Sequence, residues 1–238
     1  MPPESVTPNL TGQQTSMDLA TMPEEKLTLL ERRHEYGDVY TYLFKPAQPI
    51  PYRAGQYAHV RLFGMPPEER AVREFSFASA PHDTEISFGV DSRSGSAYQR
   101  RLHAMKAGET AGIFKIKSHM TWPPPVVSDV VMIAGGIGVT PFRSMLRDLA
   151  YKRVSLTSTF IQVGRGPYQD ELSALVAEYR AIQRDELPST LAQTIQEHHD
   201  AHYYLAGSPG FVQTVAAALS ASGITRVESD EFKGLAEY

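Results

Sequence analysis

Short runs of alternating apolar and polar residues follow one another through the first half of the chain. Alternation predicts β-strands with one buried face, because successive side chains of a strand point to opposite faces. Five strands are predicted, over Lys26–Arg33, Val39–Lys45, Gln56–Phe63, Val72–Ser79 and Glu85–Val90. One helix is predicted over Ala97–Met105, before Gly108. Many short strands with few helices favour an antiparallel barrel or sandwich up to about Trp122.

The pattern changes after Pro123-Pro124-Pro125, where strands begin to alternate with helices. A continuous apolar run is typical of a parallel strand buried on both faces. Strands are predicted over Val130–Ala134, Thr157–Val163, Tyr203–Ala206 and Ile224–Val227. Three helical faces are predicted, at Phe142, Met145, Leu146 and Leu149, at Leu172, Leu175, Val176 and Tyr179, and at Phe211, Val212, Val215 and Leu219. This alternation predicts a doubly wound parallel sheet.

The two patterns predict a two-domain β + α/β chain. We expect a flexible tail over residues 1–25, a six-stranded antiparallel barrel over 26–124 and an α/β domain over 125–238. The boundary therefore falls between 124 and 125. The tail is rich in Pro, Thr, Ser and Gln, and an expression remnant explains it as well as a docking segment does.

Composition excludes several classes of protein. The chain has 238 residues and a net charge of −4, which disfavours a nucleic-acid binder because phosphate binding needs a basic surface. It has no cysteine, which excludes disulfides, thiolate metal sites and a cysteine-bound iron–sulfur cluster within the chain. No run approaches 18 apolar residues and no signal peptide is visible, so a cytoplasmic protein without a membrane span is expected.

The strongest chemical signal is a glycine-rich turn between a buried strand and a helix. Gly135, Gly136 and Gly138 leave room for a dinucleotide pyrophosphate to approach backbone N–H groups at a helix N-terminus. Thr140 is expected to cap that helix and Pro141 to lie in its first turn. A tight structural turn is the alternative.

Two weaker signals lie in the first half. The first is a strand segment with three useful side chains. Arg73 offers a positive charge for a phosphate, Phe75 offers an aromatic face on which a ring can stack, and Ser76 offers a hydroxyl for a ring nitrogen. The alternative is an amphipathic strand with a surface arginine. Gly95-Ser96-Ala97-Tyr98 leads into a short helix whose amides can bind an anion, with an ordinary capped helix as the alternative.

The order of these segments resembles the ferredoxin–NADP reductase superfamily of FAD-containing NAD(P)H oxidoreductases. The resemblance covers about Lys26 to the C-terminus, including Tyr52–Tyr57 and Asp230-Glu231-Phe232. It implies that the barrel binds flavin, with Arg73 on the FAD pyrophosphate, Glu74 beside it, Phe75 against the ring and Ser76 near N5. It also assigns the flavin phosphate to Gly95, Ser96, Ala97 and Tyr98, mainly through backbone amides.

The resemblance also implies a pyridine-nucleotide site in the second domain. Its residues are Gly135, Gly136, Gly138, Thr140, Pro141, Gly207, Ser208, Pro209 and Phe211, with Ala206 where the family usually has cysteine. Phe232 and Tyr238 are candidates to cover the flavin face, or else to pack at the domain interface. The family's Gly-Pro-x-Gly-x-Phe stretch is not visible around Lys117–Trp122, which leaves adenine binding there unassigned.

Cofactor choice depends on charge after the second strand of the nucleotide domain. Arg165 fits the 2′-phosphate of NADP, assisted by Arg143 or Arg147, whereas a surface arginine would leave NAD possible. His198 and His202 have helical spacing for a metal, but an exposed turn explains them better, and no metal is expected.

The expected function is transfer of electrons from NAD(P)H through FAD to a separate carrier such as ferredoxin or flavodoxin. An NAD(P)H:flavin or ferric reductase and a non-catalytic nucleotide-binding subunit are the alternatives. A basic patch for an acidic carrier is predicted from Arg32, Arg33, Arg53, Arg100, Arg101 and Lys106.

Overall fold

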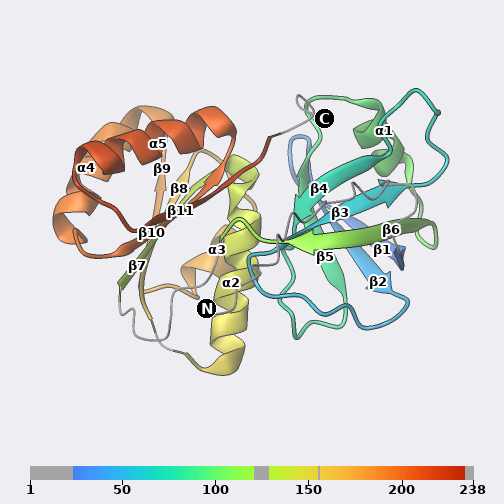
Figure 1. Cartoon of the computed structure of the whole chain (residues 1–238), viewed down its shortest axis with the longest axis horizontal. Coiled ribbons are helices and arrows are strands. Elements are labelled where there is room, and N and C mark those ends of the chain that lie inside the picture. The colour runs from blue at the N-terminus through green and yellow to red at the C-terminus, as the bar shows by residue number, and fades with distance from the viewer. Residues whose placement is uncertain (1–23, 121–128, 155, 234–238) are drawn as a thin grey trace, which may run out of the picture.

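The chain forms two domains that lie side by side (Figure 1). The computed structural model describes residues 24–120, 129–154 and 156–233. Residues 1–23 of the predicted tail and the predicted boundary at 124/125 lie outside these ranges. Among the described helices, none combines the length and the apolar character that crossing a membrane requires.

The first domain is a six-stranded sheet in the order β4-β3-β6-β1-β2-β5. Every pairing between these strands is antiparallel. The strands are β1 (Glu25–Tyr36), β2 (Val39–Pro46), β3 (Tyr57–Leu62), β4 (Val72–Ser76), β5 (Ile86–Asp91) and β6 (Thr110–Lys117). The sheet curls so that its two edge strands approach each other, and a single bridge joins Phe77 to Phe88. The predicted six-stranded antiparallel fold is confirmed, with α1 (Ala97–Ala104) close to its predicted bounds.

Strand β6 does not show the alternation of buried and exposed residues that predicts a strand, because four of its residues in succession, Ala111 to Phe114, are buried. Inside the barrel the apolar faces of all six strands meet. Large buried side chains fill this core, among them Leu27, Leu29, Tyr42, Phe44, Phe77 and Phe88. Burial of such side chains stabilises each by about 1.5–3 kcal/mol relative to exposure.

The second domain is a parallel five-stranded sheet in the order β11-β10-β7-β8-β9. Its strands are β7 (Asp129–Gly135), β8 (Thr157–Val163), β9 (Glu178–Ile182), β10 (His202–Gly207) and β11 (Val227–Glu231). The order reverses between β7 and β10, and ligands of such sheets bind at the carboxyl ends of the strands beside that point. The predicted doubly wound parallel sheet is confirmed.

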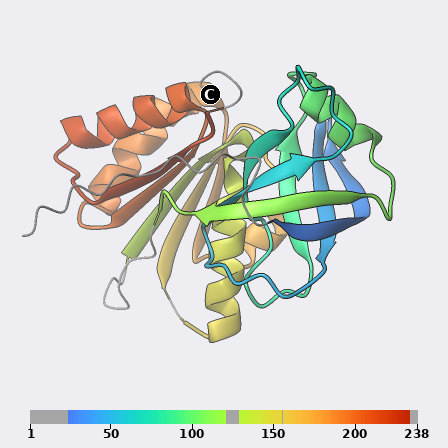
Figure 2. The same ribbon diagram turned by 45° about the vertical axis from the view of Figure 1, so that its right-hand side comes forward.

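Helices cover both faces of this sheet (Figure 2). Phe142 and Met145 of α2 (Val139–Lys152) and Leu172 of α3 (Gln169–Ser173) pack on one face. Leu191 of α4 (Leu187–Glu197) and Val215 of α5 (Pro209–Ala221) pack on the other. The buried run of β7 supplies side chains to both cores, as expected for a strand between two helical layers.

Two predicted elements of this domain are wrong. The helical face from Leu172 to Tyr179 is instead a short helix followed by the edge strand β9, where Tyr179 stacks on Phe160 of β8 at 5.5 Å. The last strand begins at Val227, not Ile224. Ile224 is buried in the turn after α5, and β11 is largely polar because it is an edge strand.

Candidate functional site

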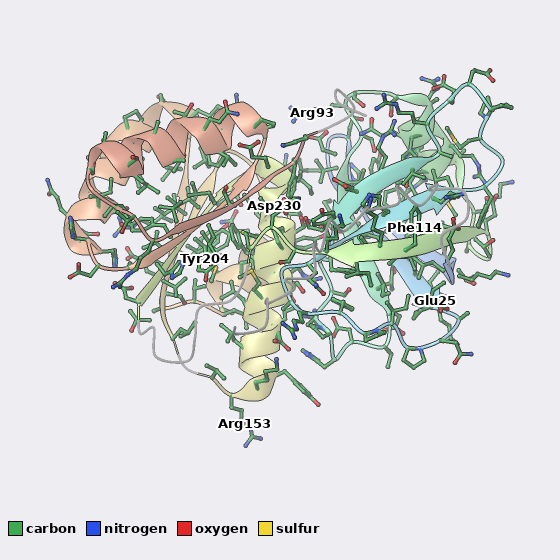
Figure 3. The ribbon with its side chains drawn as sticks, in the orientation of Figure 1. Glu25, Arg93, Phe114, Arg153, Tyr204 and Asp230 are labelled. Carbon is green, nitrogen blue, oxygen red and sulfur yellow. The ribbon has the colours of Figure 1, made fainter. Side chains whose placement is uncertain are left out.

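A cavity of about 1290 Å³ lies between the two domains. One wall comes from β3, β4, β5, β6 and the start of α1 in the barrel, and the other from the carboxyl ends of β7, β8 and β11 and from residues that follow β9 and β10. Asp230 lies where the two walls meet (Figure 3). The volume exceeds the roughly 300–1,000 Å³ of typical single-ligand sites, so the cavity has room for two ligands.

Strand β4 presents the predicted Arg-x-Phe-Ser residues to this cavity. Phe75 is half-buried, with its ring 5.8 Å from Phe88 and 5.9 Å from Tyr98. The Arg73 guanidinium lies 5.1 Å above the Tyr98 ring and donates a hydrogen bond to the carbonyl of Val72. Arg73 therefore stays at the cavity wall, where its remaining N–H groups can bind an anion.

Tyr98 is fully buried and its hydroxyl donates to the carbonyl of Val60 at 3.0 Å. Its ring belongs to the barrel core as well as to the cavity wall. The Ser96 side chain caps α1 by accepting from the Gln99 N–H, and Ser94 and Ser96 both line the cavity. The Ser94 hydroxyl donates to Oε1 of Gln99, which leaves the Ser96 hydroxyl and the Arg73 guanidinium as donors for a phosphate.

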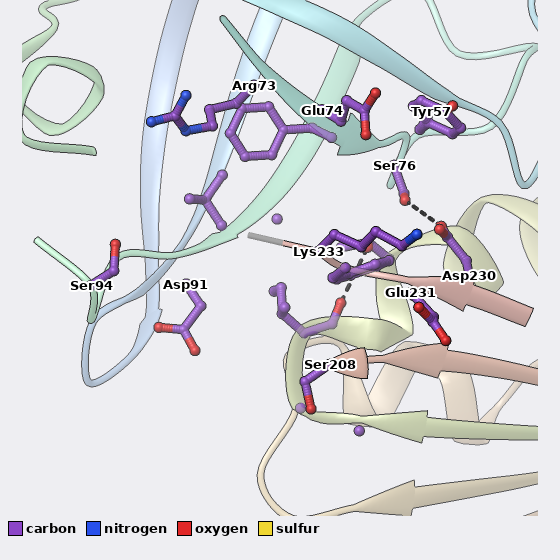
Figure 4. Close-up of a pocket in the computed structure, with 18 of the residues that line it drawn as sticks. Tyr57, Arg73, Glu74, Ser76, Asp91, Ser94, Ser208, Asp230, Glu231 and Lys233 are labelled. Atoms are coloured by element: carbon purple, nitrogen blue, oxygen red, sulfur yellow. Dashed lines mark hydrogen bonds between the residues drawn. The ribbon is translucent and has the colours of Figure 1, made fainter. Parts of the chain in front are cut away.

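One hydrogen bond joins the two walls directly. The Ser76 hydroxyl donates to Oδ2 of Asp230 at 2.9 Å, and both side chains are buried (Figure 4). Burial raises the pKa of Asp230, and the bond from Ser76 partly opposes that rise. Because its proton is committed to Asp230, the Ser76 oxygen can only accept a hydrogen bond from a ligand.

The glycine turn forms the opposite wall. Gly136 has φ +54°, a region that favours glycine, and a Cβ atom at Gly135 would lie 2.9 Å from the Phe211 ring. Gly138 lies behind the wall, where a Cβ atom would overlap the carbonyl of Ala206. Gly138 is thus needed for packing of the turn on β10. It is also the N-cap of α2, so the predicted capping by Thr140 is wrong.

Thr140 instead donates its hydroxyl to the carbonyl of Ile137 and lines the cavity. The C-terminal segment closes this side, because the Phe232 N–H donates to the carbonyl of Gly207 at 2.8 Å. Phe232 lines the cavity together with Ser208 and Phe211. Tyr238 lies outside the described residues.

The arginine predicted to bind a 2′-phosphate does not reach the cavity. The Arg165 guanidinium lies 4.4 Å above the ring of Tyr36, whose hydroxyl donates to the Arg165 carbonyl. Arg184, which follows β9, lines the cavity instead and is exposed. No ion pair or hydrogen bond of its guanidinium occurs within residues 24–120, 129–154 and 156–233.

Arg143 and Arg147 are also committed elsewhere, in a set of contacts between the domains that we call the interdomain ion network. Glu171 accepts from both arginines, at 2.6 and 3.0 Å. Arg143 also donates to the carbonyl of Ala78 at 2.8 Å, and Arg147 donates to Asp83 at 2.7 Å. The expected assistance of these two arginines to a 2′-phosphate is therefore wrong.

Tyr168 extends the same contact. Its hydroxyl lies 2.6 Å from Oγ1 of Thr41 in β2, and the Arg143 guanidinium lies 4.5 Å above its ring. Burial raises the pKa of Tyr168 to about 12, so the phenol is neutral at physiological pH. The backbone of Tyr168 has φ +67°, which is strained for a tyrosine and is maintained by these contacts.

Twelve of the predicted site residues line the cavity. They are Arg73, Glu74, Phe75, Ser76, Ser96, Tyr98, Gly135, Gly136, Thr140, Ser208, Phe211 and Phe232. Seven others lie outside its lining, namely Gly95, Ala97, Gly138, Pro141, Arg165, Gly207 and Pro209. Several of these belong to the turns that place the lining residues, so their backbone position matters more than their contact with the cavity.

Sequence reasoning missed Asp230, Gly89 and Arg184 as site residues. Asp230 is recognisable only once the structure shows it buried in β11, where an acid is unusual. Nothing in the sequence marks Gly89 of β5 as a site residue, although a Cβ atom there would lie 2.6 Å from the Thr140 side chain. None of the six residues of the predicted basic patch lines the cavity, and Arg101 is paired with Glu109.

His198 and His202 do not share a helical face. His198 follows α4, with Nδ1 2.9 Å from the carboxylate of Asp129, whereas His202 begins β10. Within the ranges that the structure describes, no group of three or more His, Cys, Asp and Glu residues is arranged to bind a metal.

Comparison with known proteins identifies similar reductases. The model of the ferric reductase NAD-binding domain family matches residues 127–171. The terephthalate 1,2-dioxygenase reductase component 2 of Comamonas sp. is 25% identical over 194 residues, which are 73% of this chain and 56% of that protein. The chain thus spans little more than half the length of this relative.

Two solved structures show the same fold. The flavohem-like FAD/NAD-binding domain of a nitric oxide dioxygenase from Vibrio cholerae superposes with a TM-score of 0.75 at 22% identity, covering 87% of this chain and 98% of that one. A ferredoxin NADP+ reductase from Neisseria gonorrhoeae with bound FAD and NADP superposes with a TM-score of 0.71 at 16% identity, with the same coverage.

Proposed function

Because the chain belongs by fold to the ferredoxin–NADP reductase superfamily, we propose that it is an FAD-dependent NAD(P)H reductase that passes electrons to a separate protein carrier, such as a ferredoxin or a flavodoxin. The observation that carries this proposal is the position of two ring-binding walls on one cavity. Arg73, Phe75 and Ser76 lie on one wall and the glycine turn lies on the other.

The residues present fit a flavin on the barrel wall. Phe75 offers a flat, half-buried ring, and Ser76 offers a hydrogen-bond acceptor at the end of the same strand. Arg73 and Ser96 line the same cavity and offer donors for a phosphate. When bound, FAD would supply hydride acceptance from NAD(P)H and onward delivery of single electrons.

The chain's own contribution is to orient the two ligands. Asp230 fixes the Ser76 hydroxyl, and Gly136, where a Cβ atom would meet nothing within 4 Å, leaves room for the nucleotide to approach the backbone. Phe232 and Phe211 exclude water from the space between the walls. Such positioning accounts for a large part of the acceleration of bimolecular reactions, by about 7–11 kcal/mol in favourable cases.

For the nucleotide, we propose a preference for NADPH that rests on Arg184. Arg184 follows the carboxyl end of β9, is exposed, and lines the cavity, as Leu187 and Thr214 also do. An arginine near the adenosine end binds a 2′-phosphate that NADH lacks. Arg184→Gln is expected to raise the KM for NADPH about tenfold and leave that for NADH unchanged.

Arg165→Gln is the matched control for this test, since that guanidinium stacks on Tyr36 outside the cavity. Equal losses with both nucleotides, or a larger effect of Arg165→Gln, would contradict the assignment to Arg184.

A second candidate function, reduction of ferric chelates, is favoured by the match of residues 127–171 to the ferric reductase NAD-binding family. Both candidates predict a yellow protein whose flavin absorbance is bleached by NADPH without oxygen. Rapid reduction of ferredoxin with slow reduction of ferric citrate supports the carrier proposal, and the reverse supports the ferric one. A folded chain that binds neither flavin nor nucleotide would contradict both.

A further inference from the structure

Strand β6 carries one extra residue where it faces the cavity. Its pairing with β3 runs from Tyr57 opposite Lys117 to His59 opposite Phe114, so two steps along β3 match three along β6. The bulge contains Lys115, whose φ of +48° lies in the left-handed region that lysine rarely adopts. Bulges beside active sites often redirect a side chain, and strained backbone there is a reason to look for function.

A buried histidine stabilises this bulge. Nδ1 of His59 lies 3.3 Å from the carbonyl oxygen of Lys115, and Nε2 lies 3.0 Å from the carboxylate of Glu74 in β4. The His59 ring also packs against Phe114 at 5.4 Å. Since His59, Glu74 and Lys115 all line the cavity, the histidine ties the bulge to the strand that carries Ser76.

The bulge leaves the Lys115 ammonium half-buried at the cavity wall without a protein partner. In the described part of the chain, the ammonium makes neither a hydrogen bond nor an ion pair. Its charge lies near Glu74, where it adds to the lowering of the pKa of that carboxyl, which a hydrogen bond with His59 dominates. Lys117, two residues further on, is exposed and lies outside the cavity lining.

We propose that Lys115 is an electrostatic residue of the flavin site, which raises the reduction potential of the bound flavin. This inference rests on the proposed function. Hydride transfer adds two electrons and one proton to the ring, so its charge becomes more negative by one. A cation held at the same wall as Ser76 favours that added charge, and charges near the reactive ring atoms tune a flavin in this way.

The test compares midpoint potentials in the full chain with bound flavin, measured by anaerobic spectroelectrochemical titration. Lys115→Asn removes the charge but accepts the left-handed backbone. We expect its ratio of affinities for reduced over oxidised flavin to fall about tenfold, which equals about 30 mV in a two-electron midpoint potential. Lys115→Arg should keep the potential of the unsubstituted chain, and Lys117→Asn is the matched control that should not change it.

Thermal unfolding separates this role from a structural one. Lys115→Asn should unfold at the same or a higher temperature, because asparagine tolerates this φ better than lysine, and Lys115→Gly serves where asparagine prevents flavin binding. An unchanged potential in Lys115→Asn, or an equal fall in Lys115→Arg, overturns the assignment and leaves the proposed reductase intact. A chain that binds no flavin overturns both.

Discussion

The two domains meet in two regions that differ in chemistry. In the interdomain ion network, Arg143 and Arg147 of α2 bind Ala78 and Asp83 of the barrel, and Glu171 orients both guanidinium groups. Around the cavity, the Ser76–Asp230 hydrogen bond joins the two walls directly. The ion network fixes how the domains lie, which allows the cavity walls to remain apart for ligands.

The comparison also shows where each region tolerates change. Ion pairs at a partly exposed interface depend on side chains that can adjust, and each stabilises only modestly. The cavity walls depend on backbone that comes too close for side chains, at Gly138 against β10 and at Gly89 against Thr140. We therefore expect the largest effects at glycines and smaller ones at charges.

The largest effect is expected for Gly138→Ala. A Cβ atom there would overlap the backbone of Ala206, which cannot move without breaking β10, so we expect a loss of about 1–3 kcal/mol of stability and of nucleotide binding. Urea unfolding measures the loss of stability, and titration with NADPH measures the loss of nucleotide binding. Gly210→Ala is the matched control, because a Cβ atom there meets nothing within 4 Å. Equal behaviour of the two variants would contradict this account of the turn.

Gly89→Ala tests the width of the cavity. Its Cβ atom would lie 2.6 Å from the Thr140 side chain and 3.0 Å from that of Ile137, which forces the walls apart. Because a misplacement of about 1 Å reduces rates about 10²-fold, we expect flavin reduction by NADPH to slow by that order. Stopped-flow absorbance measures it.

The partner substitution for Gly89→Ala is Thr140→Ser, which removes the methyl group that the new Cβ would meet. The double variant should recover part of the rate. A slow double variant with normal unfolding would show that the methyl contact does not set the width of the cavity.

Glu171→Ala tests the ion network. It removes the acceptor shared by two arginines, and we expect a loss of about 1–2 kcal/mol because the group is only partly exposed. Urea unfolding at low and high salt measures it. Glu178→Ala is the control, since Glu178 pairs with Arg180 within the second domain. Flavin reduction should slow in Glu171→Ala alone, and slowing in both would contradict a specific role in domain orientation.

Asp230→Asn is expected to have the smallest effect, with the opposite sign. Burial raises the pKa of Asp230 above its ordinary value of 3.8, so its ionised form destabilises the fold. That penalty is absent below the ordinary pKa, grows as pH rises above it, and is complete once the pH exceeds the raised pKa. The variant should therefore unfold at a higher temperature than the natural chain at pH 7 and at the same temperature near pH 3. Equal unfolding temperatures at pH 7 would contradict a buried charge.

Local patterns predicted the parts of the site that are local in sequence. The glycine turn and the Arg73–Ser76 strand are each contained in a short segment, so strand, turn and residue type could be recognised together. The Ser76–Asp230 bond could not, because it joins residues 154 positions apart from different domains. The position of Lys115 in the site could not be predicted for a related reason, because its bulge depends on the pairing register between β3 and β6.

Charge predictions failed where arginines had several available partners. Arg143 and Arg147 lie one helical turn apart, and nothing local distinguishes a phosphate from the acids of a neighbouring domain. The predictions for the two edge strands of the second domain, β9 and β11, were wrong for another reason. The apolar residues from Leu172 to Tyr179 have helical spacing although they run from α3 into β9, and the polar residues of β11 do not show the pattern of a strand.

The hydrogen bond from the Phe232 N–H to Gly207 has a mechanical consequence. Gly207 also pairs with β11 in the register Gly207 to Glu231, so the turn before Ser208 and the C-terminal segment form one lever. Any displacement of this turn is therefore carried to the peptide group of Phe232, and a fluorine label on Phe232 would record it.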